Sequence, residues 1–171
     1  MGTWSGPFLI AALLLAAAGI AKTVDPTMTV GALRGVGLGI PPLVVRAVGA
    51  FEAALAVAAA ATGDPVLVFG VAGSYLVFAL FVAVALARRL PIGTCGCFGK
   101  IDAPPSWIHV AVNLGAAASA IAVGVADGGG GIAGVVRDQP LAGLPFLVLV
   151  VVGAYAAFTA LTVVPKLGAN S

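Results

Sequence analysis

The chain has 171 residues, of which 61% are hydrophobic and 8% are charged, and its formal net charge is +2. A water-soluble domain carries about 25% charged residues, so this composition excludes a soluble globular protein and predicts a chain surrounded mostly by lipid. The Lys and Arg residues do not cluster as a nucleic-acid-binding surface requires, which excludes a nucleic-acid partner.

Five apolar stretches approach the ~20 residues that a helix needs to cross ~30 Å of hydrocarbon. They run from about Trp4 to Ala21, Ala47 to Thr62, Pro65 to Ala87, Trp107 to Ala126 and Leu141 to Val164. The pattern predicts an all-α, polytopic transmembrane helical bundle. We expect a four-helix membrane domain over residues 1–126, a Gly-rich external linker over 127–140, and a C-terminal transmembrane helix with a short tail over 141–171.

The segments around the first two spans indicate whether the first helix is cleaved as a signal peptide and where the second helix begins. Met1–Pro7 contains no Lys or Arg, whereas a signal peptide begins with a basic region, so we expect the first helix to be retained. The stretch Val30–Val45 contains Arg34 and the pair Pro41-Pro42. Because proline breaks helices, we expect a connecting loop or a short interfacial segment here, with a proline stop before the second span.

The basic residues indicate an orientation in the cell (inner) membrane. Of the eight Lys and Arg, only Arg137 falls on one side of the bundle. The other seven share the opposite side: Lys22, Arg34, Arg46, Arg88, Arg89, Lys100 and Lys166. The positive-inside rule then predicts an external N-terminus, a cytoplasmic C-terminus and a cytoplasmic connection between the third and fourth spans.

Both cysteines of the chain lie in that connection, in the sequence Leu90-Pro-Ile-Gly-Thr-Cys95-Gly-Cys97-Phe-Gly-Lys100. The surrounding Gly and Pro residues predict a constrained turn. A disulfide requires Cα atoms roughly 4.4–6.8 Å apart, which an i,i+2 pair can reach in a bent chain. The cationic side chains of Arg88, Arg89 and Lys100 favour the thiolate form of a neighbouring cysteine.

Three interpretations of Cys95 and Cys97 compete. They are a redox pair that cycles between dithiol and disulfide, a metal site, or a static structural pair. A closed zinc site needs four ligands, and the turn offers two thiols, with His109 and Asp102 as further candidates. A static clip between such close residues stabilises little, because it closes almost no loop. We favour the redox pair and expect no metal.

Two ionisable residues within the spans are further candidates for supporting roles. Glu52 costs about 2.5–3.5 kcal/mol in a membrane helix unless it is paired. Lys22 is its expected partner, because Arg46 on the same helix is not on the same face. Either an ion pair that holds the bundle or a proton relay for thiol chemistry would explain Glu52. His109, beside the cysteine turn, could assist proton transfer or simply hydrogen-bond at the interface.

The residues Ala18-Gly-Ile-Ala-Lys22-Thr-Val-Asp-Pro26, Phe51-Glu52 and Cys95-Gly-Cys-Phe-Gly99 resemble the methylamine utilisation protein MauE family, which is related to DoxX-like four-helix membrane proteins. The resemblance covers about Pro7 to Val125. It implies a membrane protein that helps methylamine dehydrogenase to mature, alongside a thioredoxin-like protein. A general role in thiol–disulfide exchange transfers better than the methylamine substrate.

We therefore expect a membrane thiol–disulfide oxidoreductase or maturation factor with catalytic Cys95 and Cys97, supported by Lys22, Glu52, Arg89 and His109. Its partner would be a thioredoxin-like protein or an exported cysteine-containing protein. An exported partner conflicts with a cytoplasmic turn. Electrons that cross the membrane, a turn folded into the bundle, or the opposite orientation would each resolve that conflict.

Other functions and partners remain open at this stage. A membrane quinone is a candidate electron carrier, although no residue pattern identifies a site for it. One alternative is a non-catalytic assembly subunit that packs against other membrane subunits. A small transporter is the other, and its sign would be a cavity that contains Lys22 and Glu52 and opens to one side.

Overall fold

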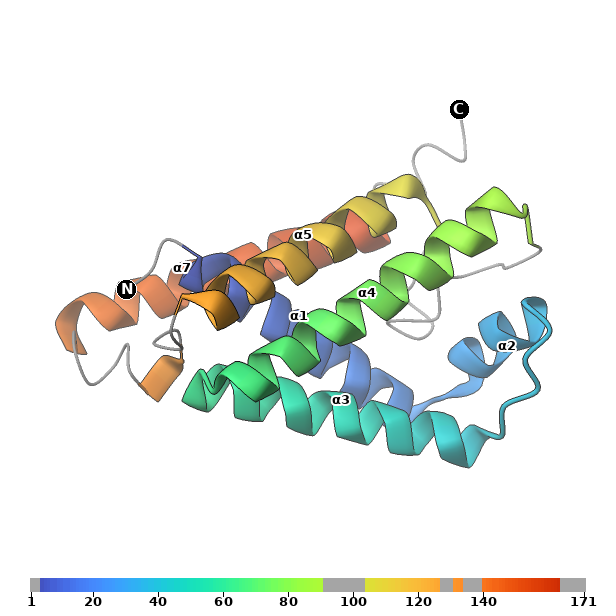
Figure 1. Cartoon of the computed structure of the whole chain (residues 1–171), viewed down its shortest axis with the longest axis horizontal. Helices are drawn as coiled ribbons and strands as arrows, with labels where there is room; N and C mark the ends of the chain where they lie inside the picture. The colour runs from blue at the N-terminus through green and yellow to red at the C-terminus, as the bar shows by residue number, and fades with distance from the viewer. Residues whose placement is uncertain (1–3, 91–103, 127–130, 134–139, 164–171) are drawn as a thin grey trace.

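The computed structural model describes residues 4–90, 104–126, 131–133 and 140–163, and its long elements are all helices (Figure 1). They are α1 (Ser5–Val24), α2 (Thr27–Gly35), α3 (Pro42–Thr62), α4 (Pro65–Ala87), α5 (Trp107–Val125) and α7 (Pro140–Thr162). Five of them, all except α2, contain a segment long and apolar enough to cross a membrane. The chain is therefore a multi-pass membrane protein with a helical bundle, as its sequence predicted.

The five long helices run along the length of the molecule, and α2 lies at one end, where α1 ends and α3 begins (Figure 1). Helix α1 packs mainly against α3 and also against α5 and α7, while α4 packs mainly against α5. The core where these helices meet includes Phe8 and Leu15 of α1, Val68 and Val71 of α4, and Ala120 of α5, all fully buried. Helix α3 contributes the small residues Ala56, Ala59 and Ala60 to this core, and small residues let the backbones of neighbouring helices approach closely.

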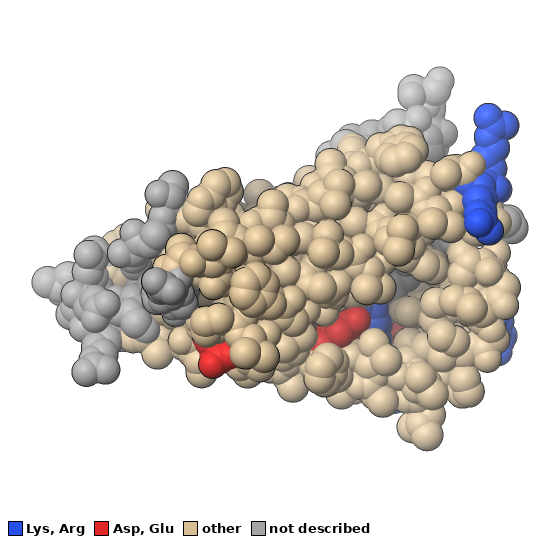
Figure 2. All heavy atoms as spheres, viewed as in Figure 1, with Lys and Arg blue, Asp and Glu red and all other residues tan. Residues whose placement is uncertain are grey.

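The outer surface of the bundle is apolar. Figure 2 shows a face that is almost wholly tan along its length, with Lys and Arg atoms gathered at the end that holds α2. Many large apolar side chains are exposed on the long helices, among them Val57, Val66, Val77, Leu80, Val125 and Leu149. Since such a surface is unfavourable in water, these side chains are the ones that contact lipid.

The proline pair before the second span starts a helix instead of stopping one, so that prediction was wrong. Pro41 is extended, with φ −62° and ψ 145°, and Pro42 is the first residue of α3. Proline suits this position because its fixed φ matches the helix and its missing N–H has no intrahelical acceptor there. Helix α3 therefore begins at Pro42, well before the predicted boundary at Ala47.

The stretch between the first two spans, expected to be a connecting loop or a short interfacial segment, is not wholly a loop, because it contains most of α2. This helix has nine residues, too few to cross a bilayer. Its Ala32 packs against Ala85 near the end of α4, and Phe81 and Leu90 join the same small cluster. Helix α2 is thus fixed to the end of α4, directly before the segment that carries the two cysteines.

A two-residue turn joins α3 to α4. Gly63 adopts the left-handed conformation, with φ 68°, which glycine allows without a steric penalty. The Asp64 carboxylate accepts hydrogen bonds from the backbone N–H groups of Val66 at 2.9 Å and Leu67 at 3.3 Å, so it caps α4. Gly131 lies against this turn, because a Cβ atom there would be 2.6 Å from the backbone nitrogen of Gly63.

Candidate functional site

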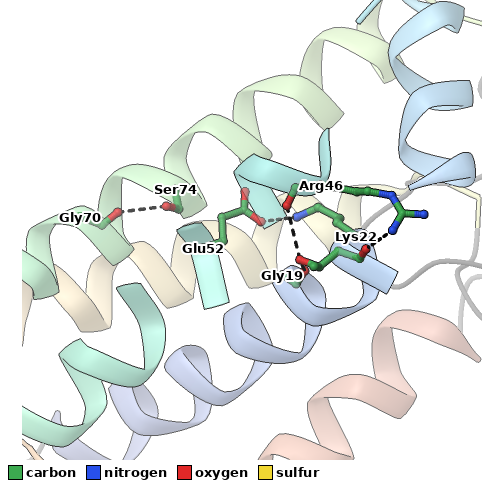
Figure 3. A network of polar contacts seen from close by, with 7 residues as sticks. Gly19, Lys22, Arg46, Glu52, Gly70 and Ser74 are labelled. Carbon is green, nitrogen blue, oxygen red and sulfur yellow. Dashed lines mark hydrogen bonds and ion pairs between the residues drawn. The ribbon is translucent and has the colours of Figure 1, made fainter. Parts of the chain in front are cut away.

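An ion pair is buried between α1 and α3. Lys22 Nζ lies 2.6 Å from Glu52 Oε2, and the two side chains are 5% and 7% exposed. Figure 3 shows the two side chains pointing toward one another. The pairing predicted from the cost of a lone carboxylate in the bundle is therefore confirmed. Each charge stabilises the other where water cannot.

Two glycines that the sequence analysis did not single out bring the charges together. Gly19 and Gly49 each precede the charged residue of their helix by three positions, so they share its face. A Cβ atom at Gly19 would lie 2.5 Å from the Gly49 carbonyl oxygen, and one at Gly49 would lie 2.8 Å from Lys22 Cβ. The helices can approach this closely only because both residues are glycine. The Gly-x-x-Lys and Gly-x-x-Glu spacing was the signal that could have revealed the crossing.

Phe78 of α4 completes the surroundings of the ammonium group. Lys22 Nζ lies 4.4 Å from the centre of the Phe78 ring, within the range of a cation–π interaction. Tyr75 packs edge-on against Phe78, with ring centroids 6.1 Å apart, and donates a hydrogen bond to the Ala11 carbonyl oxygen at 2.6 Å. The aromatic pair therefore connects the ion pair to the centre of the bundle.

Arg46 ties the ends of α1 and α3 together beside the ion pair (Figure 3). Its Nη1 donates to the Thr23 carbonyl oxygen at 3.0 Å, and the Thr23 hydroxyl donates to the Gly19 carbonyl oxygen at 2.8 Å. The bond to Thr23 satisfies a carbonyl group at the end of α1 that has no partner within the helix. Arg46 is exposed and stabilises the helix crossing through this hydrogen bond. The ion pair with Glu52 is formed by Lys22.

A cavity of about 240 Å³ lies beside the ion pair. Lys22, Glu52 and Thr29 line it, and its other lining side chains are apolar: Ala32, Leu33, Ile40, Val44, Val45, Val48, Val77, Phe78 and Phe81. Figure 2 shows acidic and basic atoms side by side in a hollow of the otherwise tan face. A cavity that contains both Lys22 and Glu52 is one of the features expected of a small transporter. Its walls, however, are those of a site for an apolar molecule and not of a hydrated path.

Two other predicted site residues, His109 and Arg89, lie near the same end of the bundle. His109, in the first turn of α5, is 2% exposed, and its Nδ1 lies 2.9 Å from the Ser106 hydroxyl oxygen. Phe78 lines both the cavity beside the ion pair and a small one beside His109, so it lies between these two cavities. Arg89 is exposed just after α4, with φ 50°. Cys95 and Cys97 lie outside the described residues.

Comparison with known proteins gives one family. The family described as methylamine utilisation protein MauE matches residues 3–127, which include all of α1 to α5 and the segment between α4 and α5. No curated protein and no solved structure matches the chain.

Proposed function

Because the chain belongs to the MauE family of methylamine utilisation proteins, we propose that it is a membrane thiol–disulfide exchange or protein-maturation factor that uses Cys95 and Cys97. The observation that carries the proposal is the position of the only two cysteines. They lie one residue apart in the connection between α4 and α5. Its partner is a thioredoxin-like protein or an exported protein that acquires disulfides.

The described ends of this connection supply groups that thiol chemistry uses. Arg88 and Arg89 are exposed after the last turn of α4, and their positive charges favour a thiolate nearby. His109 is buried at the start of α5, and histidine is a common proton donor and acceptor in catalysis. Leu90, the last described residue before the cysteines, is held by its backbone N–H, which donates to the Ala85 carbonyl oxygen at 3.0 Å.

The exchange consists of two displacements at sulfur. A thiolate attacks one sulfur of a disulfide, a mixed disulfide forms, and the other sulfur leaves as a thiolate. The second cysteine of the attacking pair then attacks the mixed disulfide and releases the product. In sum, one disulfide is reduced while the other dithiol is oxidised, and no external electrons are needed at this stage.

The distribution of charge supports a cytoplasmic position for the connection. Arg34 in α2, Arg46 in α3 and the pair Arg88 and Arg89 after α4 lie toward the same end of the bundle. Basic residues accumulate on the cytoplasmic side of membrane proteins. We propose that this end, with Cys95 and Cys97, faces the cytoplasm and that the N-terminus is outside.

Thiol trapping in intact cells tests the redox function and the orientation together. Cells are treated with membrane-permeant or impermeant alkylating agents, and the mass added to the protein is compared before and after reduction. We expect a fraction of the Cys95–Cys97 pair to be oxidised and the reduced fraction to react with the permeant agent alone. Labelling by the impermeant agent would show that the connection with Cys95 and Cys97 lies outside, opposite to the proposed orientation.

Serine variants separate catalysis from assembly. Of the variants Cys95→Ser and Cys97→Ser, one retains the attacking cysteine and lacks the cysteine that resolves the mixed disulfide. We expect that variant to accumulate a mixed disulfide with the partner, visible on a non-reducing gel. The double variant should give none. If both cysteines stay reduced under all growth conditions and the double variant matures its partner normally, the protein is a non-catalytic assembly subunit instead.

A further inference from the structure

The cavity beside the ion pair has the chemistry of a site for a ring-sized, lipid-soluble molecule. Its volume of about 240 Å³ is close to the lower limit of ~300 Å³ for pockets that hold drug-sized ligands. Apolar side chains from α2, α3 and α4 form most of its walls, and Phe78 and Phe81 contribute two aromatic rings. Such walls favour a flat apolar ring and disfavour a phosphate or a sugar.

The ion pair gives the same cavity hydrogen-bonding capacity. An ammonium group has three N–H donors, and Lys22 directs one of them to Glu52 Oε2. Among the residues that the structure describes, Lys22 Nζ has no other hydrogen-bond acceptor and Glu52 Oε1 has no donor. A ligand in this cavity can therefore accept a hydrogen bond from Lys22 while Lys22 stays paired with Glu52.

The cavity is also reachable from lipid. Val44, Val48 and Val77 line it and are 47%, 47% and 64% exposed, on a surface that contacts the bilayer. A ligand with an apolar tail could leave that tail among the lipid chains while its ring enters between α3 and α4.

The cavity shares structure with the segment that carries the cysteines. Phe81 lines the cavity and also packs with Ala85 and Leu90 in the cluster that joins α2 to α4. Leu90 is the residue from which the chain continues toward Cys95. The cavity and the base of the cysteine segment thus have a wall in common.

We propose that this cavity binds the ring of a lipid-soluble quinone, which accepts the electrons released when Cys95 and Cys97 are oxidised. The inference rests on the proposed function, because it identifies the oxidant of that dithiol. Two S–H bonds break and one S–S bond forms, which releases two electrons and two protons. The quinone takes up both electrons and both protons and becomes the hydroquinone, so the reaction balances with no further reactant.

The ion pair positions the quinone ring by a hydrogen bond. Lys22 donates a hydrogen bond to one carbonyl oxygen of the ring and stabilises the negative charge that develops there on reduction. Glu52 holds the Lys22 ammonium group in place for this hydrogen bond. Both groups are therefore binding residues as well as a structural pair, which explains why a charged pair is kept beside an apolar cavity.

Binding of decylubiquinone to the full chain in nanodiscs tests the site. Two variants of α4 form a matched comparison, because Val77 and Leu80 are 64% and 65% exposed and only Val77 lines the cavity. We expect Val77→Trp to fill the cavity and to raise the Kd at least tenfold, and Leu80→Trp to leave the Kd within twofold. A photoreactive azidoquinone should label peptides from α2, α3 or α4 in the wild-type protein, and excess decylubiquinone should suppress that labelling.

The outcomes distinguish this inference from the proposed function. Equal affinity of Val77→Trp and the wild type, labelling elsewhere in the chain, or a phospholipid at the cavity that decylubiquinone does not displace would each overturn the quinone site. If the cysteines still cycle in cells, the proposed function stands without it. If decylubiquinone binds as expected while the double Cys→Ser variant still matures the partner normally, the cavity is a quinone site but the thiol function is wrong.

Discussion

Separating the two charges of the Lys22–Glu52 pair should cost far more stability than removing both. In Lys22→Met the Glu52 carboxylate remains in a site where its side chain is 7% exposed, and in Glu52→Leu the ammonium group remains. An unpaired charge in a membrane helix costs ~2.5–3.5 kcal/mol, and breaking a buried pair costs about 3–5 kcal/mol. We expect each single variant to lose about 3 kcal/mol of unfolding free energy.

The double variant Lys22→Met/Glu52→Leu should lie within about 1 kcal/mol of the wild type, because replacing a buried pair by apolar side chains is often nearly neutral. The two substitutions would then be coupled by about 5 kcal/mol, well above the ~0.5 kcal/mol error of additivity for independent sites. Reversible unfolding in mixed micelles with increasing dodecyl sulfate, followed by circular dichroism, measures these values.

A matched control and a clear refutation accompany this measurement. Arg34→Ala removes an exposed charge on α2 and should change the unfolding free energy by less than ~0.5 kcal/mol. If the double variant loses as much stability as the two single variants together, the charges act independently. The ion pair would then not be what stabilises the two charges inside the bundle.

Three further substitutions test other parts of the fold by the same unfolding assay. Gly19→Ala places a Cβ atom 2.5 Å from the Gly49 carbonyl oxygen and should cost about 1–3 kcal/mol, whereas Gly73→Ala, with no atom within 4 Å of its Cβ, should be neutral or slightly stabilising. Equal losses for the two glycines would show that the close crossing is unimportant. Asp64→Ala removes the cap of α4 and should cost ~1 kcal/mol; Asp64→Asn, which keeps the accepting oxygen, should restore most of it. Phe78→Leu removes the ring under the Lys22 ammonium and should cost about 1–2 kcal/mol beyond the lost apolar area, and that excess should vanish when Lys22 is already Met.

The sequence predicted best where a helix boundary depends on local chemistry. The span Pro65–Ala87 is the same in the structure, because Asp64 caps the helix and Pro65 occupies its first position. The pairing of Lys22 with Glu52 was also predictable, since a carboxylate in a membrane helix needs a cation and few are available.

The cavity was not predictable, because it depends on how helices distant in the sequence pack together. Its walls come mostly from α2, α3 and α4, and the stretch that contains most of α2 was expected to be a connecting loop or a short interfacial segment. The Pro41-Pro42 pair was misinterpreted for a simpler reason. Proline has opposite effects in the interior and at the first position of a helix, and local sequence does not distinguish the two when neither flank is strongly polar.

The turn at Gly63 and Asp64 has a consequence for biosynthesis. Only these two residues separate α3 from α4, so α4 must turn back across the bilayer as soon as α3 has crossed it. We therefore expect the two helices to enter the lipid together, as one hairpin. A reporter or epitope inserted at this turn should abolish insertion of both helices, while a tag fused at either terminus of the chain leaves the hairpin intact.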